Sequence, residues 1–130
     1  MKPEEPAKRG VANLLKKHGC YFFKPAMNGM GRAGIPDFIA CIRGRMLAVE
    51  TKALGKRATP LQQKEIDGIN AAGGVAVVVD EAKLEALERL LLVMLSAPPL
   101  GVRLLNEAER EAPKSEWTPM NTFSKGAKLP

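Results

Sequence analysis

The sequence has few of the side chains that usually bind zinc, with two cysteines and one histidine in 130 residues. Cys20 and Cys41 do not form a C-x-x-C pair, and His18 is the only histidine. A zinc site built from cysteine and histidine is therefore excluded. We expect both thiols to be reduced and mostly buried, in a cytoplasmic protein.

Long hydrophobic runs are also missing. The longest apolar stretch in a predicted helix is 90–95, far short of the roughly 20 residues that span a bilayer. The first residues are not followed by the apolar segment of a signal peptide. The basic residues do not line one face of a single amphipathic helix, as a membrane-surface helix requires. We therefore expect no membrane partner.

Positive charge is abundant and unevenly distributed. The net charge is +6, from 20 basic and 14 acidic residues. Residues 1–57 carry twelve basic and four acidic side chains, which gives +8, whereas 58–130 carry eight and ten, which gives −2. Such a basic half favours a polyanionic partner. Nucleic acid is the first choice; an anionic membrane is the second, and the lack of a basic amphipathic helix disfavours it.

Periodicity and turn residues predict seven elements. Helices are expected over 5–18, from the N-cap Thr59 to about 72, and over 81–95; strands are expected over 20–23, 37–42, 46–52 and 75–79. The order αβββαβα implies an α/β fold in which a mixed sheet is flanked by helices. Because 96–99 break the pattern, we predict one domain over 1–96 and a C-terminal extension or tail over 97–130.

The glycine-rich loop 29–34 matches G-x-G-x-x-G as a string. A dinucleotide-binding loop of this type follows a strand and opens a helix, so that the helix N-terminus meets the pyrophosphate. Here the loop leads into a predicted strand, which excludes that function. Its backbone could still approach a phosphate closely.

Charged residues at the ends of two predicted strands form the strongest chemical pattern. Glu50 and Lys52 are two residues apart on a strand, so their side chains leave the same face. The hairpin partner strand can bring Asp37 beside them. Two close carboxylates need a cation between them, and oxygen ligands favour Mg²⁺ or Mn²⁺. Such an ion can polarise a phosphoryl oxygen and activate water, while Lys52 stabilises the growing negative charge.

The same E-x-K triplet occurs a second time as Glu81-Ala82-Lys83 and serves as a control. It opens a predicted helix, where residues two apart point to different sides, so we expect only surface charge there. The alternative for Glu50 and Lys52 is a solvated cross-strand pair. Their place in a strand with buried neighbours, such as Val49, disfavours that alternative.

Three segments in this order resemble the VRR-NUC nucleases of the PD-(D/E)xK superfamily. They are 31–37 (GRAGIPD), 47–53 (LAVETKA) and 59–62 (TPLQ), and the resemblance covers residues 4 to about 95. It implies a restriction-endonuclease-like core and hydrolysis of DNA phosphodiester bonds with Mg²⁺ or Mn²⁺. The small stand-alone members are typically homodimers that act on four-way junctions, which implies branched DNA as the substrate here.

The resemblance also implies roles for individual residues. Asp37, Glu50 and the backbone carbonyl of Thr51 would bind the metal, and Lys52 would be the catalytic lysine. Gln62 matches a glutamine that lies beside the family's active site. An acidic residue of the first helix completes that site; Glu4 fits best and Glu5 is the alternative.

Further basic residues are candidates for phosphate contacts. Lys56 and Arg57 adjoin the predicted site on a glycine-containing loop, and Lys24 and Arg32 fall at useful positions, although plain surface charge explains those two equally well. The main alternative function is a non-catalytic nucleic-acid-binding domain with a nuclease fold. A third is an adaptor whose acidic region over 80–116 binds a partner.

Overall fold

The computed structural model describes residues 2–26 and 31–100. Gly29 and Met30 of the glycine-rich loop, and residues 101–130 of the predicted extension, lie outside these residues. The described elements are α1 (Glu5–Lys17), β1 (Tyr21–Phe23), β2 (Phe38–Ile42), β3 (Arg45–Thr51), α2 (Pro60–Ala71), β4 (Val75–Val79), a 3₁₀ turn η1 (Glu81–Lys83) and α3 (Leu84–Leu95). The predicted order αβββαβα is confirmed.

The four strands form one mixed sheet in the order β1-β2-β3-β4. β1, β2 and β3 pair antiparallel, whereas β4 pairs parallel to β3 after the crossover through α2. Arg43 and Gly44 connect β2 to β3 and both have positive φ angles (54° and 89°), as a two-residue type I′ hairpin requires. The predicted mixed sheet is thus confirmed, and the arrangement is that of a restriction-endonuclease-like α/β core.

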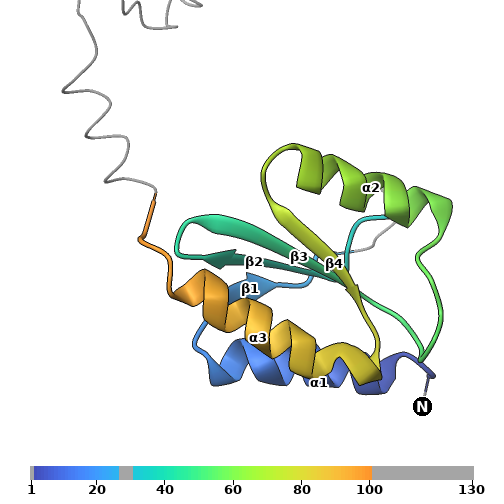
Figure 1. Cartoon of the computed structure of the whole chain (residues 1–130). Coiled ribbons are helices and arrows are strands. Elements are labelled where there is room, and N and C mark those ends of the chain that lie inside the picture. Colours follow the sequence, from blue (N-terminus) through green and yellow to red (C-terminus); the bar gives the residue numbers. More distant parts are fainter. Residues whose placement is uncertain (1, 27–30, 101–130) are drawn as a thin grey trace, which may run out of the picture. The chain divides into compact units, whose positions relative to one another are not determined.

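Helices cover both faces of the sheet (Figure 1). α1 and α3 lie together on one face, where the main core forms. Its largest fully buried side chains include Leu15 from α1, Phe38 and Leu47 from the sheet, and Leu91 from α3. This layer holds most of the buried apolar surface and fixes α1 against β2 and β3.

α2 covers the opposite face only over β3 and β4. Its apolar cluster is small, with Ala48, Ile66 and Ala76 at its centre. The part of this face that belongs to β1 and β2 carries exposed side chains, and they include Tyr21, Phe23 and Cys41. The expectation that both cysteines are mostly buried is therefore wrong for Cys41, although both are free thiols.

The last helix begins later than predicted. Residues 81–83 form the 3₁₀ turn, in which the Lys83 N–H donates to the Asp80 carbonyl and the Asp80 side chain accepts from the Ala82 N–H. α3 proper starts at Leu84 because Asp80 caps this tighter turn first. No helix among residues 2–26 and 31–100 is long and apolar enough to cross a membrane.

Candidate active site

A polar cavity of about 420 Å³ lies at the end of β3 and is lined also by residues at the starts of α1 and α2. Ten residues line it: Glu4, Lys8, Asp37, Glu50, Thr51, Lys52, Ala53, Lys56, Arg57 and Gln62. They come from segments far apart in the sequence, which meet because β2 pairs with β3 and the loop after β3 leads into α2. Eight of the ten are residues that the sequence singled out.

A close backbone approach holds Asp37 beside the start of α2. Gly34 has a φ of +86°, and a Cβ atom there would stand 2.5 Å from the carbonyl oxygen of Leu61. Only glycine satisfies both conditions. The loop before β2 is thus pressed against α2, which brings Asp37 and Gln62 to the same cavity.

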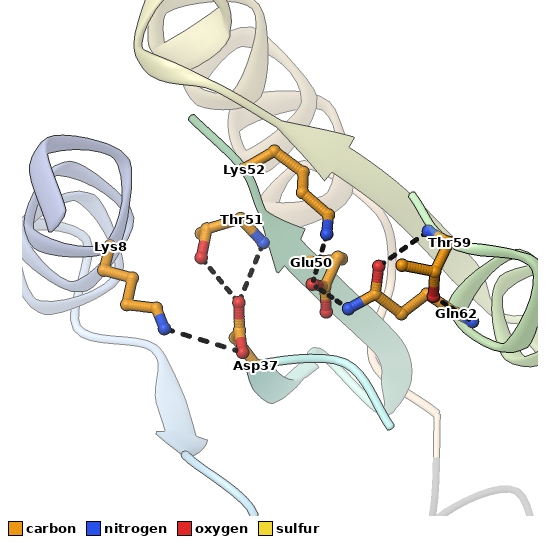
Figure 2. Close-up of polar contacts among 7 residues, drawn as sticks. All are labelled: Lys8, Asp37, Glu50, Thr51, Lys52, Thr59 and Gln62. Atoms are coloured by element: carbon orange, nitrogen blue, oxygen red, sulfur yellow. Dashed lines mark hydrogen bonds and ion pairs between the residues drawn. The ribbon is translucent and has the colours of Figure 1, made fainter. Parts of the chain in front are cut away.

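One oxygen of Asp37 is fixed by the neighbouring strand. Its Oδ2 accepts a hydrogen bond of 3.0 Å from the backbone N–H of Thr51 and another from the Thr51 hydroxyl (Figure 2). Its Oδ1 lies 3.9 Å from Nζ of Lys8 on α1. One carboxylate oxygen is therefore anchored, and the other faces a cation.

Glu50 is the most deeply buried charged residue of the cavity, with 3% of its surface exposed. Its Oε2 accepts a hydrogen bond of 2.8 Å from Nε2 of Gln62 and lies 4.0 Å from Nζ of Lys52. Its Oε1 is buried and has no hydrogen-bond partner among the described residues. Burial raises the pKa of Glu50 to about 7; the charge of Asp37 adds to this rise, while Lys52 and Lys8 oppose it.

Gln62 joins the helix cap of α2 to the carboxylate of Glu50. Thr59 caps α2 by accepting from the Gln62 N–H, and the Gln62 side chain accepts in return from the Thr59 N–H at 2.9 Å. This capping box fixes the amide with its oxygen toward Thr59 and its nitrogen toward Glu50 (Figure 2). The T-P-L-Q segment therefore positions the glutamate as well as starting the helix.

The donor set fits a hard divalent cation. Each of Asp37 and Glu50 has one oxygen held by protein N–H or O–H groups, and the partnerless Oε1 of Glu50 is a buried acceptor that a cation would satisfy. In 2–26 and 31–100, no three His, Cys, Asp or Glu side chains are grouped closely enough to hold a metal alone. Two carboxylates, the Thr51 carbonyl and water suit Mg²⁺, which keeps several of its waters in protein sites.

The remaining predicted residues divide into two groups. Glu4, the N-cap residue of α1, lines the cavity, as do Lys56 and Arg57, whereas Glu5 does not. Lys24 and Arg32 also lie outside the cavity lining. Lys24 Nζ lies 5.5 Å from the centre of the Phe38 ring, and Arg32 forms a 3.0 Å ion pair with Glu65 of α2. These protein contacts account for their positions without nucleic acid.

Lys8 is the charged residue that the sequence analysis missed. It lines the cavity and faces Asp37 (Figure 2). Its signal was available, because residues four apart on a helix share a face. Once Glu4 is a candidate, Lys8 follows from the same spacing.

Comparison with known proteins gives one significant relative in a phage. The chain is 36% identical over 85 residues to "Putative nuclease p44" of Acyrthosiphon pisum secondary endosymbiont phage 1. The aligned part covers 65% of this chain and 89% of the phage protein. No protein-family model matches the chain, and no solved structure matches it significantly. At this identity and coverage, the chain belongs to the same nuclease family as the phage protein.

Proposed function

We propose that this protein is a metal-dependent DNA endonuclease of the VRR-NUC type, which hydrolyses phosphodiester bonds in branched DNA such as four-way junctions. One observation carries the proposal: Asp37, Glu50, Thr51, Lys52 and Gln62 line a single polar cavity at the end of β3. The family relationship to a phage nuclease supports hydrolysis of nucleic acid in general.

The carboxylates of Asp37 and Glu50, with the carbonyl of Thr51, would hold Mg²⁺ or Mn²⁺. A bound ion of this type polarises a phosphoryl oxygen and lowers the pKa of a coordinated water. Glu4 also lines the cavity and would complete the set of metal ligands.

Lys52 is suited to stabilise the negative charge that develops on the phosphoryl oxygens. Its ammonium lies 4.0 Å from Glu50, and 18% of its side chain is exposed, so it is held at the cavity wall rather than in bulk solvent. A preorganised cation at such a place acts mainly on the transition state. Gln62 positions Glu50, and the loop cations Lys56 and Arg57 would bind neighbouring phosphates.

A homodimer accounts for action on a branched substrate. Asp37, Glu50 and Lys52 of one chain make up one candidate active site, whereas cleavage of two strands needs two sites in a fixed relation. Twofold symmetry supplies such a relation. Light scattering at micromolar concentration should therefore give the mass of a dimer, and a monomer alone would contradict this part of the proposal.

The deciding experiment incubates the purified full chain with four-way junctions and with linear duplexes of the same sequence, in Mn²⁺, Mg²⁺ or EDTA. We expect nicking that requires the metal and is faster on the junction. Binding without cleavage in either metal would favour the non-catalytic DNA-binding alternative. Neither binding nor cleavage would overturn the proposal and favour an adaptor.

A further inference from the structure

A second cavity continues from the first around the edge of the sheet. It has a volume of about 410 Å³ and shares Lys56 and Arg57 with the candidate active site. Its other lining residues are Ala58, Pro60, Gln63, Val78 and Lys83. We call this cavity the basic side groove. Its charged lining residues are all cations: Lys56, Arg57 and Lys83.

The three cations are available to an external anion. Lys56, Arg57 and Lys83 are all exposed, and within the described part of the chain none of them forms an ion pair. By contrast, Arg32 is paired with Glu65, and Lys17 with Glu88. Cations that gather in one hollow and form no ion pair repel one another, so an anion bound there would be favourable.

A buried carboxylate ties the two walls of the groove together. Asp80 is 7% exposed, and its Oδ2 accepts from the N–H of Gly55 at 3.0 Å, while its Oδ1 accepts from the N–H of Ala82 at 3.0 Å. The N–H of Gly55 lowers the pKa of Asp80, and the charge of Lys83 does so as well. The loop that carries Lys56 and Arg57 is thereby fixed to the turn that carries Lys83. The backbone segments that carry the three cations are therefore held in place before an anion binds.

We infer that the basic side groove binds the DNA backbone next to the cleaved bond, and that Lys83 is a phosphate-binding residue. The inference rests on the proposed nuclease function and assigns a direction to the substrate: one strand passes from the active site over Lys56 and Arg57 toward Lys83. The E-x-K pattern of residues 81–83 does not predict this role. The role of Lys83 follows from its place in the lining of the basic side groove.

The test measures DNA affinity against salt concentration in EDTA, so that no cleavage occurs. Each phosphate contact on duplex DNA contributes about −0.9 to the slope of log K against log salt. Lys83→Ala should therefore reduce the magnitude of the slope by about 0.9 and weaken binding roughly 5- to 10-fold near 0.1 M salt. Lys83→Arg should keep both values. Lys16 is an exposed residue in the last turn of α1 and does not line either cavity. Lys16→Ala removes the same charge and should leave the slope unchanged.

Neutral methylphosphonates placed one at a time around the cleavage position refine the test. For wild type, a substitution on one side of the cleaved bond should weaken binding, and the same substitution should have no effect on Lys83→Ala. The inference is overturned if Lys83→Ala behaves like Lys16→Ala while wild type still cleaves in Mn²⁺. If wild type neither binds nor cleaves DNA, the proposed function fails together with the inference.

Discussion

The chain contains the triplet E-x-K twice, in two settings that differ in secondary structure, burial and ion pairing. Glu50-Thr51-Lys52 ends a strand in the sheet, where Glu50 is buried and its carboxylate lies 4.0 Å from the ammonium of Lys52. Glu81-Ala82-Lys83 forms the 3₁₀ turn before α3, where all three residues are exposed. No ion pair joins Glu81 to Lys83 in the described structure.

The difference shows that local geometry gives the triplet its chemistry. On a strand, residues two apart lie on the same face, so Glu50 and Lys52 meet beside α2. On a 3₁₀ turn, three residues complete a turn, so residues two apart diverge. Burial then makes the first pair distinctive, because it raises the pKa of Glu50 and leaves Oε1 without a partner. Glu81 is the natural control for every test of Glu50.

The largest effect is expected from removing the carboxylate of the first triplet, Glu50. Glu50→Gln, like Asp37→Asn, keeps the shape of the site but removes a charge that we propose binds the metal, so cleavage should fall on the order of 1000-fold. DNA binding should survive or tighten, because repulsion of phosphate is relieved. Glu81→Gln should cleave at the wild-type rate. Single-turnover cleavage in Mn²⁺ measures all three, and wild-type rates for both site variants would mean that the site is elsewhere.

The next effect concerns the lysine of the first triplet. Lys52→Ala should still bind Mn²⁺, at least as tightly as wild type, since lysine is not a ligand and its charge opposes that of the ion, but it should lose cleavage on the order of 100-fold through lost transition-state stabilisation. Calorimetric titration with metal and cleavage at saturating protein separate these two quantities. Lys16→Ala controls for net charge. Equal losses of metal affinity and of rate in Lys52→Ala would show that the lysine organises the metal site instead.

Stability without metal should depend on pH through Glu50. The folded-state pKa is about 7, against an ordinary value of 4.5. Between these values the folded protein binds more protons than the unfolded chain, so this residue lowers stability as pH rises, and its penalty is complete above about pH 7. Glu50→Gln removes the penalty and should stabilise the metal-free protein at pH 8 by on the order of 3 kcal/mol.

Urea unfolding in EDTA at several pH values checks this expectation. The gain of Glu50→Gln over wild type should shrink toward zero near pH 4, where the carboxyl is protonated in both states. A gain for Glu50→Gln that does not vary with pH would instead indicate a packing effect.

The sequence predicted the helices and strands well where local signals and burial agree. Thr59-Pro60, the valine run 75–79 and Gly19 marked boundaries that the structure keeps within a residue or two. The convergence of Asp37 with Glu50 and Lys52 also followed, because a hairpin register carries a residue at the start of one strand to the end of the next. The metal and the roles of these residues stay predictions.

Other features could not be predicted, because they depend on contacts between distant segments. The exposure of Cys41 follows from α2 covering only β3 and β4, which no local pattern records. The link from Asp80 to Gly55 joins residues 25 apart and creates the side groove. Lys8 differs from these two cases: its spacing from Glu4 could have placed it at the cavity, and only its contact with Asp37, which lies in another element, was beyond the sequence.

The smallest expected effect concerns Lys8, whose ammonium group lines the same cavity as the triplet Glu50-Thr51-Lys52. Its Nζ lies 3.9 Å from Oδ1 of Asp37, and 28% of its side chain is exposed, so solvent screens the pair to roughly 0.2–1 kcal/mol. A metal ion that approaches Asp37 must replace this contact. Lys8→Ala should therefore bind Mn²⁺ about 2- to 5-fold more tightly in the absence of DNA, as measured by calorimetric titration. Lys16→Ala, which changes the net charge equally, should bind like wild type; equal gains in both variants would show that net charge, and not the contact with Asp37, sets the affinity.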